Sequence, residues 1–181
     1  GLSEVTGAGY VAVGENADIV GVAARIAFSQ APPPSHIYIG TLGAEEDISE
    51  KLDGLLSVDG WYAICPVGLT QEQLKTVIQW TEAQKKICAF AAYGPAESTE
   101  TVYYRSFGIY CKRNSTQADE DVPLENQCIG VAWAAKCLNY HAGKETWAHK
   151  VLAGITPSEL TSTEIAALEG SNISYFITTA S

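Results

Sequence analysis

The stretch that decides the fold is "WYAICPVGLTQEQLKTVIQWTEAQKKICAFAAY", residues 61–93. It ends on a run, 87–93, that is apolar at consecutive positions, as expected of a strand buried on both faces of a sheet. Its middle holds a capping box, Thr70 with Gln73, followed by apolar residues at helical spacing. A shorter apolar run, 61–67, opens the stretch. The order strand, helix, strand predicts two parallel strands joined by a helix.

Two helices and one more strand are indicated upstream. Residues 16–30 have one apolar face, with Asn16 as the cap, and residues 44–58 have another, with acidic residues in the first turn. Between them "HIYIG", 36–40, has the composition of a short strand. The residues expected to point inward are Ile19, Val20, Ala23, Ala24, Ala27, Ile48, Leu52, Leu55 and Leu56. We therefore expect an α/β fold with a largely parallel or mixed sheet flanked by helices, whose strands include 37–39, 61–67 and 87–92.

Downstream of residue 93 the pattern continues with a strand, a loop and a helix. "RSFGIYCK", 105–112, predicts a further strand. The segment 113–122 is polar and acidic, and we expect it to be a mobile surface loop. Residues 124–140 are apolar nearly all round, which predicts a helix buried on more than one side. The length favours a single α/β domain over residues 1–181.

The carboxyl-terminal part has several helix start and stop signals. Thr156 can cap one short helix, and Thr161 with Glu164 forms a capping box for a second. Gly170 then offers a left-handed residue that would end this second helix. The run 172–178 is expected to be the last strand.

The chain is acidic, with a net charge of -10 and a pI near 4.6. A protein of this charge repels a phosphate backbone and an anionic membrane surface, so neither nucleic acid nor membrane is an expected partner. Its longest apolar runs also fall short of the roughly 20 residues that a membrane-spanning helix needs.

The cysteines indicate buried thiols in a reducing compartment. They are odd in number, form no C-x-x-C pair and lie inside apolar runs, unlike a disulfide framework. The five are Cys65, Cys88, Cys111, Cys128 and Cys137.

One motif favours a nucleotide. Gly7, Gly9 and Ala12 satisfy the G-x-G-x-x-A pattern, in which glycines let the main chain approach a pyrophosphate. No apolar strand precedes Gly7, and Gly14 interrupts a helix beginning there, so an ordinary glycine-rich lead-in is favoured. A nucleotide-dependent α/β enzyme using residues 7–12 is retained as the alternative function.

Other candidates for chemistry are explained by ordinary structural roles. His36, His141 and His149 have no cysteine or acidic residue at the spacing of a closed metal site. The acidic run 119–121 lacks the alternating ligands of a calcium loop, and acids before a helix are explained by its dipole. No catalytic, cofactor-binding or metal-binding residue is therefore assigned, no cofactor is expected, and the chain is not expected to be an enzyme.

A longer pattern is similar to a known family. "TWAHKVLAGITPSELTSTEIAALEGSNISYFI", 146–177, resembles a segment of the contractile tail sheath proteins of tailed bacteriophages of the myophage type. Weaker similarity to that family extends over 24–40, 61–87 and 103–110. The matching residues of the long segment are Thr146, Trp147, Lys150, Leu152, Gly154, Thr156, Pro157, Leu160, Thr161, Thr163, Ala167, Leu168, Asn172, Tyr175 and Phe176.

The resemblance implies a mechanical function. Sheath subunits surround a tail tube, and the sheath shortens and widens during genome delivery. The implied partners are other sheath subunits, the tube and the baseplate, and the implied location is the virion tail, assembled in the host cytoplasm. Sheath proteins are usually several hundred residues long, with terminal arms that join strands of neighbours. The resemblance therefore implies that the chain is a fragment of the sheath subunit, and we expect this fragment alone to be monomeric.

Overall fold

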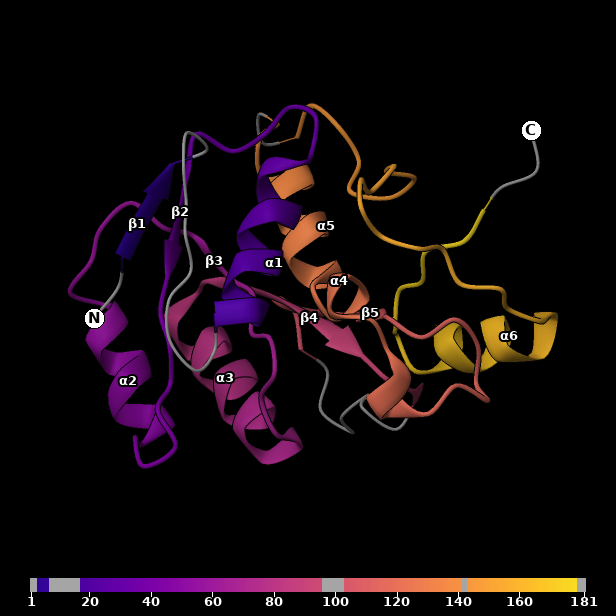
Figure 1. Cartoon of the computed structure of the whole chain (residues 1–181), viewed down its shortest axis with the longest axis horizontal. Coiled ribbons are helices and arrows are strands. Elements are labelled where there is room, and N and C mark those ends of the chain that lie inside the picture. The colour runs from indigo at the N-terminus through magenta and orange to yellow at the C-terminus, as the bar shows by residue number, and fades with distance from the viewer. Residues whose placement is uncertain (1–2, 7–16, 96–102, 141–142, 179–181) are drawn as a thin grey trace.

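The main sheet has three parallel strands. In this computed structural model, which describes residues 3–6, 17–95, 103–140 and 143–178, they lie in the order β3 (Ala63–Ile64), β4 (Ile87–Ala92) and β5 (Ser106–Tyr110). Helices flank the sheet (Figure 1). The predicted α/β class is therefore confirmed.

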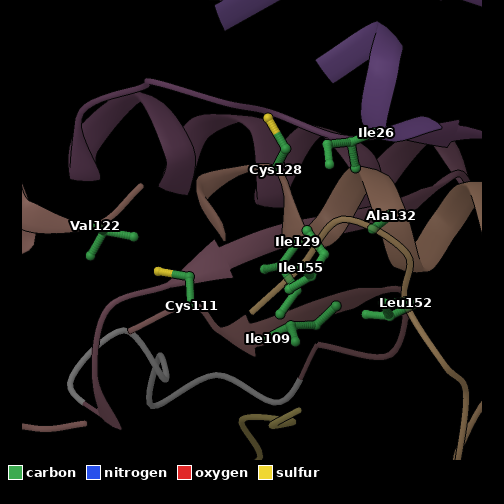
Figure 2. Close-up of a cluster of buried hydrophobic side chains, with 9 residues drawn as sticks. All are labelled: Ile26, Ile109, Cys111, Val122, Cys128, Ile129, Ala132, Leu152 and Ile155. Carbon is green, nitrogen blue, oxygen red and sulfur yellow. The ribbon is translucent and has the colours of Figure 1, made fainter. Parts of the chain in front are cut away.

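Helices cover both faces of this sheet. One face packs against α1 (Ala17–Phe28), α4 (Leu124–Gln127) and α5 (Ile129–Cys137), and α1 and α5 lie side by side (Figure 1). The other face packs against α2 (Ile48–Leu55) and α3 (Gln71–Gln84). The first of these two cores is shown in Figure 2.

Strand β4 lies between the two cores. Cys88 and Phe90 belong to the core under α2 and α3, whereas Ala91 packs against the core under α1 and α5. Ala89 between them is fully buried as well. A strand with both faces buried is apolar at consecutive positions, and this prediction for residues 87–92 is confirmed.

The helix starts follow the capping signals. Thr70 Oγ1 accepts from the Gln73 amide and Gln73 Oε1 accepts from the Thr70 amide, which confirms the capping box of α3. Helix α2 begins later than 44, because Asp47 caps it by accepting from the amides of Ser49 and Glu50. On α2, Leu52 is buried as expected, but Leu56 is exposed because the helix ends before it.

The placement of 37–39 in the main sheet is wrong. These residues belong to β2 (His36–Ile39), which pairs antiparallel with β1 (Ser3–Thr6) in a separate two-stranded sheet. The polar sequence of β1, "SEVT", has no apolar alternation that would mark it as a strand. Because β2 is only half-buried, hydrogen bonding to β1 rather than burial in the main sheet determines its position.

The strand expected over 61–67 is much shorter. Only Ala63 and Ile64 pair with β4. Pro66 has no amide hydrogen to donate to a ladder, and Gly68 turns the chain with a φ of 71°. The next strand, β5, lies within the expected range 105–112.

The helix expected at 124–140 is divided into two. Helix α4 ends and α5 begins at Cys128, whose φ of -90° and ψ of 15° depart from helical values. Its burial on several sides is confirmed, because Ile129, Ala132 and Cys137 are all buried.

The acidic loop 113–122 has defined local structure. It contains a short 3-10 helix, Asp119–Asp121, and Asp119 forms an ion pair with Lys112 Nζ at 2.8 Å. The Gln117 side chain accepts from the Arg113 amide and donates to the Asp121 carbonyl. These contacts give the loop a defined conformation, and its mobility stays a prediction.

The carboxyl-terminal elements differ from expectation in part. Thr161 and Glu164 cap α6 (Ser162–Gly170), which confirms that capping box. The prediction that Gly170 is the left-handed residue is wrong: Gly170 is the last residue of the helix, and Asn172 has the positive φ, 55°. Thr156 is followed by a non-helical segment up to Thr161, so the short helix expected there is wrong. Asn126 instead binds both the amide and the carbonyl of Thr156.

Among the described residues, no helix combines the length and apolar character needed to cross a membrane.

Candidate functional site

The residues of the long sequence pattern lie in the segment 143–178, which we call the strap. It leaves the end of α5, passes α1 and α4, and forms α6 before returning to β5 (orange to yellow in Figure 1). Its contacts with the core are made at five places along its length. They are described here in chain order.

The first contact is aromatic. Trp147 of the strap meets Trp133 of α5 edge to face, with ring centroids 4.8 Å apart, and Trp133 Nε1 donates to the Trp147 carbonyl at 3.2 Å. Phe107 of β5 completes the group, at 5.3 Å from Trp133 and 6.2 Å from Trp147. We call these three residues the aromatic anchor. Aromatic pairs in this geometry contribute about 0.5–1.5 kcal/mol beyond their burial.

The second contact is a buried amide at the end of α1. Gln30 is 2 % exposed, its Nε2 donates to the Ala153 carbonyl at 3.0 Å, and its Oε1 accepts from the Ala153 amide at 3.1 Å. The side chain thus binds the strap main chain as a neighbouring strand would. Gly154 follows with φ 76°, and a Cβ there would lie 2.7 Å from Ile26 Cδ1.

The third contact repeats this arrangement on α4. Asn126 is 4 % exposed, and its Oδ1 accepts from the Thr156 amide at 3.1 Å. Its Nδ2 donates to the carbonyls of Thr156 and Cys111, both at 3.0 Å. One side chain therefore joins the strap to the end of β5.

The fourth contact lies beyond the end of β5. Ser158 Oγ donates to the Lys112 carbonyl at 2.6 Å, and the Glu159 amide donates to the Arg113 carbonyl at 2.7 Å. Arg113 and Glu159 also form an exposed ion pair. The Thr156 carbonyl, which would accept the first hydrogen bond of a helix, accepts instead from Asn126 Nδ2, and the helix expected here does not form.

Helix α6 and the last residues form the fifth contact. Glu164 accepts from the amides of Ser115 and Thr161, and hydrogen bonds from Ser115 and then from Thr161 lower the pKa of Glu164 to about 2. After α6, the Ser174 amide donates to the Gly108 carbonyl and the Ser174 carbonyl accepts from Tyr110. Ser174 thereby forms an isolated parallel bridge with Ile109 of β5, and the strand expected at 172–178 is wrong, because only such single bridges form there.

The two buried amides could not be recognised in the sequence. Gln30 and Asn126 lie in or next to helices, where a polar side chain is usually solvated. Nothing near them in the chain distinguishes a buried carboxamide from an exposed one. Their partners are 123 and 30 residues away.

The cysteines do not resemble nucleophiles. All five remain as thiols, four of them buried, and burial raises the pKa of Cys65 and Cys128 to about 12 and that of Cys88 well above its usual value. Cys65 is only partly buried as a residue, but its Sγ is directed inward, 3.7 Å from the Gly130 carbonyl. The prediction of buried thiols is confirmed for the other four.

The glycine-rich stretch 7–12 lies outside the described residues. A strand, β1, ends at Thr6 and α1 begins at Ala17, so the strand that the motif requires before it is present although the sequence did not indicate it. In a dinucleotide-binding unit, however, the strands on either side of the helix are parallel. Here β1 and β2 are antiparallel.

The histidines and the acidic run are not brought together. His36 Nδ1 lies 3.0 Å from Ser35 Oγ in β2, His149 is exposed with φ 56°, and His141 lies outside the described residues. Within the described part of the chain, no cluster of histidine, cysteine and acidic side chains has the geometry of a metal site.

Comparisons with protein-family models, curated proteins and solved structures found no significant match to this chain.

Proposed function

We propose that the chain is part of a structural subunit of a phage contractile tail sheath. The observation that supports this proposal is that residues of the sheath-like pattern have structural roles in the strap: they pack against the core, cap a helix or allow a tight turn. Trp147 belongs to the aromatic anchor, Leu152 and Leu168 are buried, and Gly154 allows the strap to approach α1. Thr161 caps α6 and Asn172 supplies the left-handed residue after it.

These residues all fasten one part of the chain to another. A subunit that transmits force needs such a body, because load passes between subunits through packed surfaces. Nearly rigid subunits with two alternative packings would then account for contraction. The extended packing would be metastable, and the contracted packing would be lower in free energy. Other subunits, the tail tube and the baseplate are the proposed partners, and the virion tail is the proposed location.

Immunoelectron microscopy tests this function directly. Antibodies raised against residues 1–181 would be applied to phage or tail-like particles produced by the organism that encodes the chain. We expect regular labelling along the tail between its two ends. Labelling confined to the head, or absent from particles whose preparation contains the protein, would contradict the proposal.

The alternative is a nucleotide-dependent α/β enzyme, favoured by the order β1, glycine-rich stretch 7–12, α1. Thermal unfolding with NAD(H) or ATP distinguishes the two functions. A ligand that binds the folded state raises the midpoint as its concentration increases. Saturable stabilisation that Gly9→Val removes would favour the enzyme, whereas an unchanged midpoint at millimolar nucleotide favours the structural subunit.

A further inference from the structure

A groove opens at the edge of the main sheet where its strands begin. It has a volume of about 280 Å³ and is lined by Tyr62, Ile87, Tyr104, Arg105 and Phe107. Tyr62 directly precedes β3, Ile87 begins β4, and Tyr104 and Arg105 directly precede β5. The parallel arrangement of the strands thus brings these residues to one edge. We call this feature the strand-start groove.

Aromatic rings form most of its wall. Tyr104 is 82 % exposed and Tyr62 is 51 % exposed, which is unusual for side chains of this size. Phe107 also belongs to the aromatic anchor, so the groove rests on the packed rings of Trp133 and Trp147. Tyrosine, tryptophan and arginine on a rigid base are the residues that most often dominate the affinity of protein interfaces.

Among the described residues, no carboxylate forms an ion pair with Arg105. The other two arginines form ion pairs, Arg25 with Glu125 and Arg113 with Glu159. In the described residues Arg105 donates from its guanidinium only to the Lys85 carbonyl, at 3.1 Å. A guanidinium has five N–H donors, so most of them remain for an external acceptor.

The carboxylate of Glu82, at the end of α3, is already engaged by the start of β5. Glu82 accepts from the amides of Tyr104 and Arg105 and from Ser106 Oγ, at 3.3, 2.7 and 3.1 Å. These bonds hold the start of β5 against α3, and within the described part of the chain the Arg105 guanidinium forms no ion pair. The positive group of Arg105 in an aromatic wall therefore complements a carboxylate next to an apolar side chain.

We propose that the strand-start groove docks an acidic segment of a partner protein. An apolar side chain of that segment lies between Tyr62, Tyr104 and Phe107, and a neighbouring carboxylate pairs with Arg105. The volume of about 280 Å³ lies at the lower end of the roughly 300–1,000 Å³ of ligand sites, and it accommodates one apolar side chain of a peptide. The inference does not depend on the sheath function, because it uses only the groove and its charge.

Binding of defined peptides tests the proposal. Three fluorescein-labelled nonapeptides would each carry a central leucine, flanked on both sides by glutamates, glutamines or lysines, and a second set would carry phenylalanine instead. In fluorescence polarisation at physiological salt, where the net charge of -10 is screened at distances beyond the groove, we expect the glutamate peptides to bind at least tenfold more tightly than the glutamine peptides. The lysine peptides should show no saturable binding.

Variants of the groove make the result specific. Arg105→Gln should remove the difference between glutamate and glutamine peptides, and Tyr104→Ser should weaken both. Arg113→Gln, beyond the other end of β5, and Val151→Ser, an apolar residue 80 % exposed that does not line the groove, are the matched controls and should bind as wild type does. Circular dichroism would establish that each variant is folded.

Several outcomes would overturn the proposal. Equal binding of glutamate and glutamine peptides would show that Arg105 does not select a carboxylate. No saturable binding by any glutamate peptide, or binding that Arg105→Gln leaves unchanged, would remove the groove as the site. Self-association in sedimentation velocity that Tyr104→Ser abolishes would assign the groove to a second copy of this chain instead.

Discussion

At the scale of single residues, Gly130 of α5 packs closely against the main chain of β4. A Cβ on Gly130 would lie 2.5 Å from the Ala89 carbonyl oxygen and 2.9 Å from the Phe90 amide nitrogen. Both neighbours are main-chain atoms of a central strand, so neither can move without disturbing the sheet. The absence of a side chain at this position therefore determines how closely α5 approaches the sheet.

We expect Gly130→Ala to destabilise the protein by about 2–3 kcal/mol, because α5 must move away from β4. Gly54→Ala is the matched control, since Gly54 lies in α2 with no neighbour within 4 Å of an added Cβ. It should stabilise the protein by about 0.5–1 kcal/mol through helix propensity. Urea unfolding measures both changes, and similar effects of the two substitutions would contradict this account.

The thiols provide the second prediction at this scale. A pKa of about 12 for Cys65 and Cys128, against 9.0 for an unperturbed thiol, lowers the thiolate fraction near pH 8 by about a thousandfold. We expect labelling by an aromatic disulfide reagent to follow unfolding and not direct attack. A cysteine that reacts within seconds in native buffer, identified by peptide mapping, would show that its thiol is not enclosed.

At the scale of elements, the strap is a separate feature held by side chains of α1, α4, α5 and β5. Ordinary secondary structure satisfies its main chain only in α6. Gln30 and Asn126 each satisfy one amide and one carbonyl of the strap. A buried main-chain group that loses its partner costs about 1–3 kcal/mol, so each carboxamide should control local opening.

We expect Asn126→Ala to accelerate amide exchange at Thr156 while exchange at Ala153 changes little. Gln30→Ala should instead accelerate exchange at Ala153 and change exchange at Thr156 little. Each side chain binds only its own part of the strap. Global stability should fall by about 2–3 kcal/mol in each variant. Hydrogen exchange measured by nuclear magnetic resonance resolves the two amides. Equal acceleration at both positions in either variant would mean that the strap opens as one unit.

Glu164 of α6 makes the free energy of unfolding depend on pH in the acid range. The Glu164 pKa is lowered from 4.5 to about 2, so below pH 4.5 the unfolded chain takes up a proton that the folded chain still excludes. The contribution of Glu164 is therefore present above pH 4.5 and is lost as the pH falls toward 2. We expect the stability of the wild type to decrease more steeply than that of Glu164→Gln over this range. Parallel slopes in urea titrations would contradict the assignment.

At the scale of the whole molecule, charge opposes self-association. Every copy has a net charge of -10, and the ion pairs of the surface, such as Arg25 with Glu125, are already formed within one chain. Repulsion between copies is strongest at low ionic strength, where the screening length is long.

We therefore expect residues 1–181 to be monomeric at tens of micromolar in low salt. Static light scattering, read with a monodisperse standard of similar mass, gives the weight-average mass. Raising the salt concentration screens the charge and serves as the internal comparison. A stable ring or tube formed by this chain alone would show that apolar contacts overcome the charge, and that terminal arms are not required for assembly.

The sequence alone determined the α/β class and the positions of the central elements. Thr70 with Gln73 and Thr161 with Glu164 form capping boxes within four residues of chain, so their geometry is local and was predicted. The consecutive apolar residues of β4 likewise reflect burial on both faces, which a one-dimensional pattern records. The same local reasoning assigned no catalytic, cofactor-binding or metal-binding residue.

Only the tertiary structure decided which strands pair and what the strap does. β2 lies in a second sheet because β1, a polar segment more than thirty residues earlier, supplies its hydrogen bonds. Thr156 starts no helix because its carbonyl accepts from Asn126 Nδ2, and the strand-start groove exists because parallel pairing brings the beginnings of three strands to one edge. These contacts join residues far apart in sequence. The free energy of such tertiary contacts exceeds the secondary-structure propensity of the segments that make them, and a local sequence pattern contains no information about the distant partner.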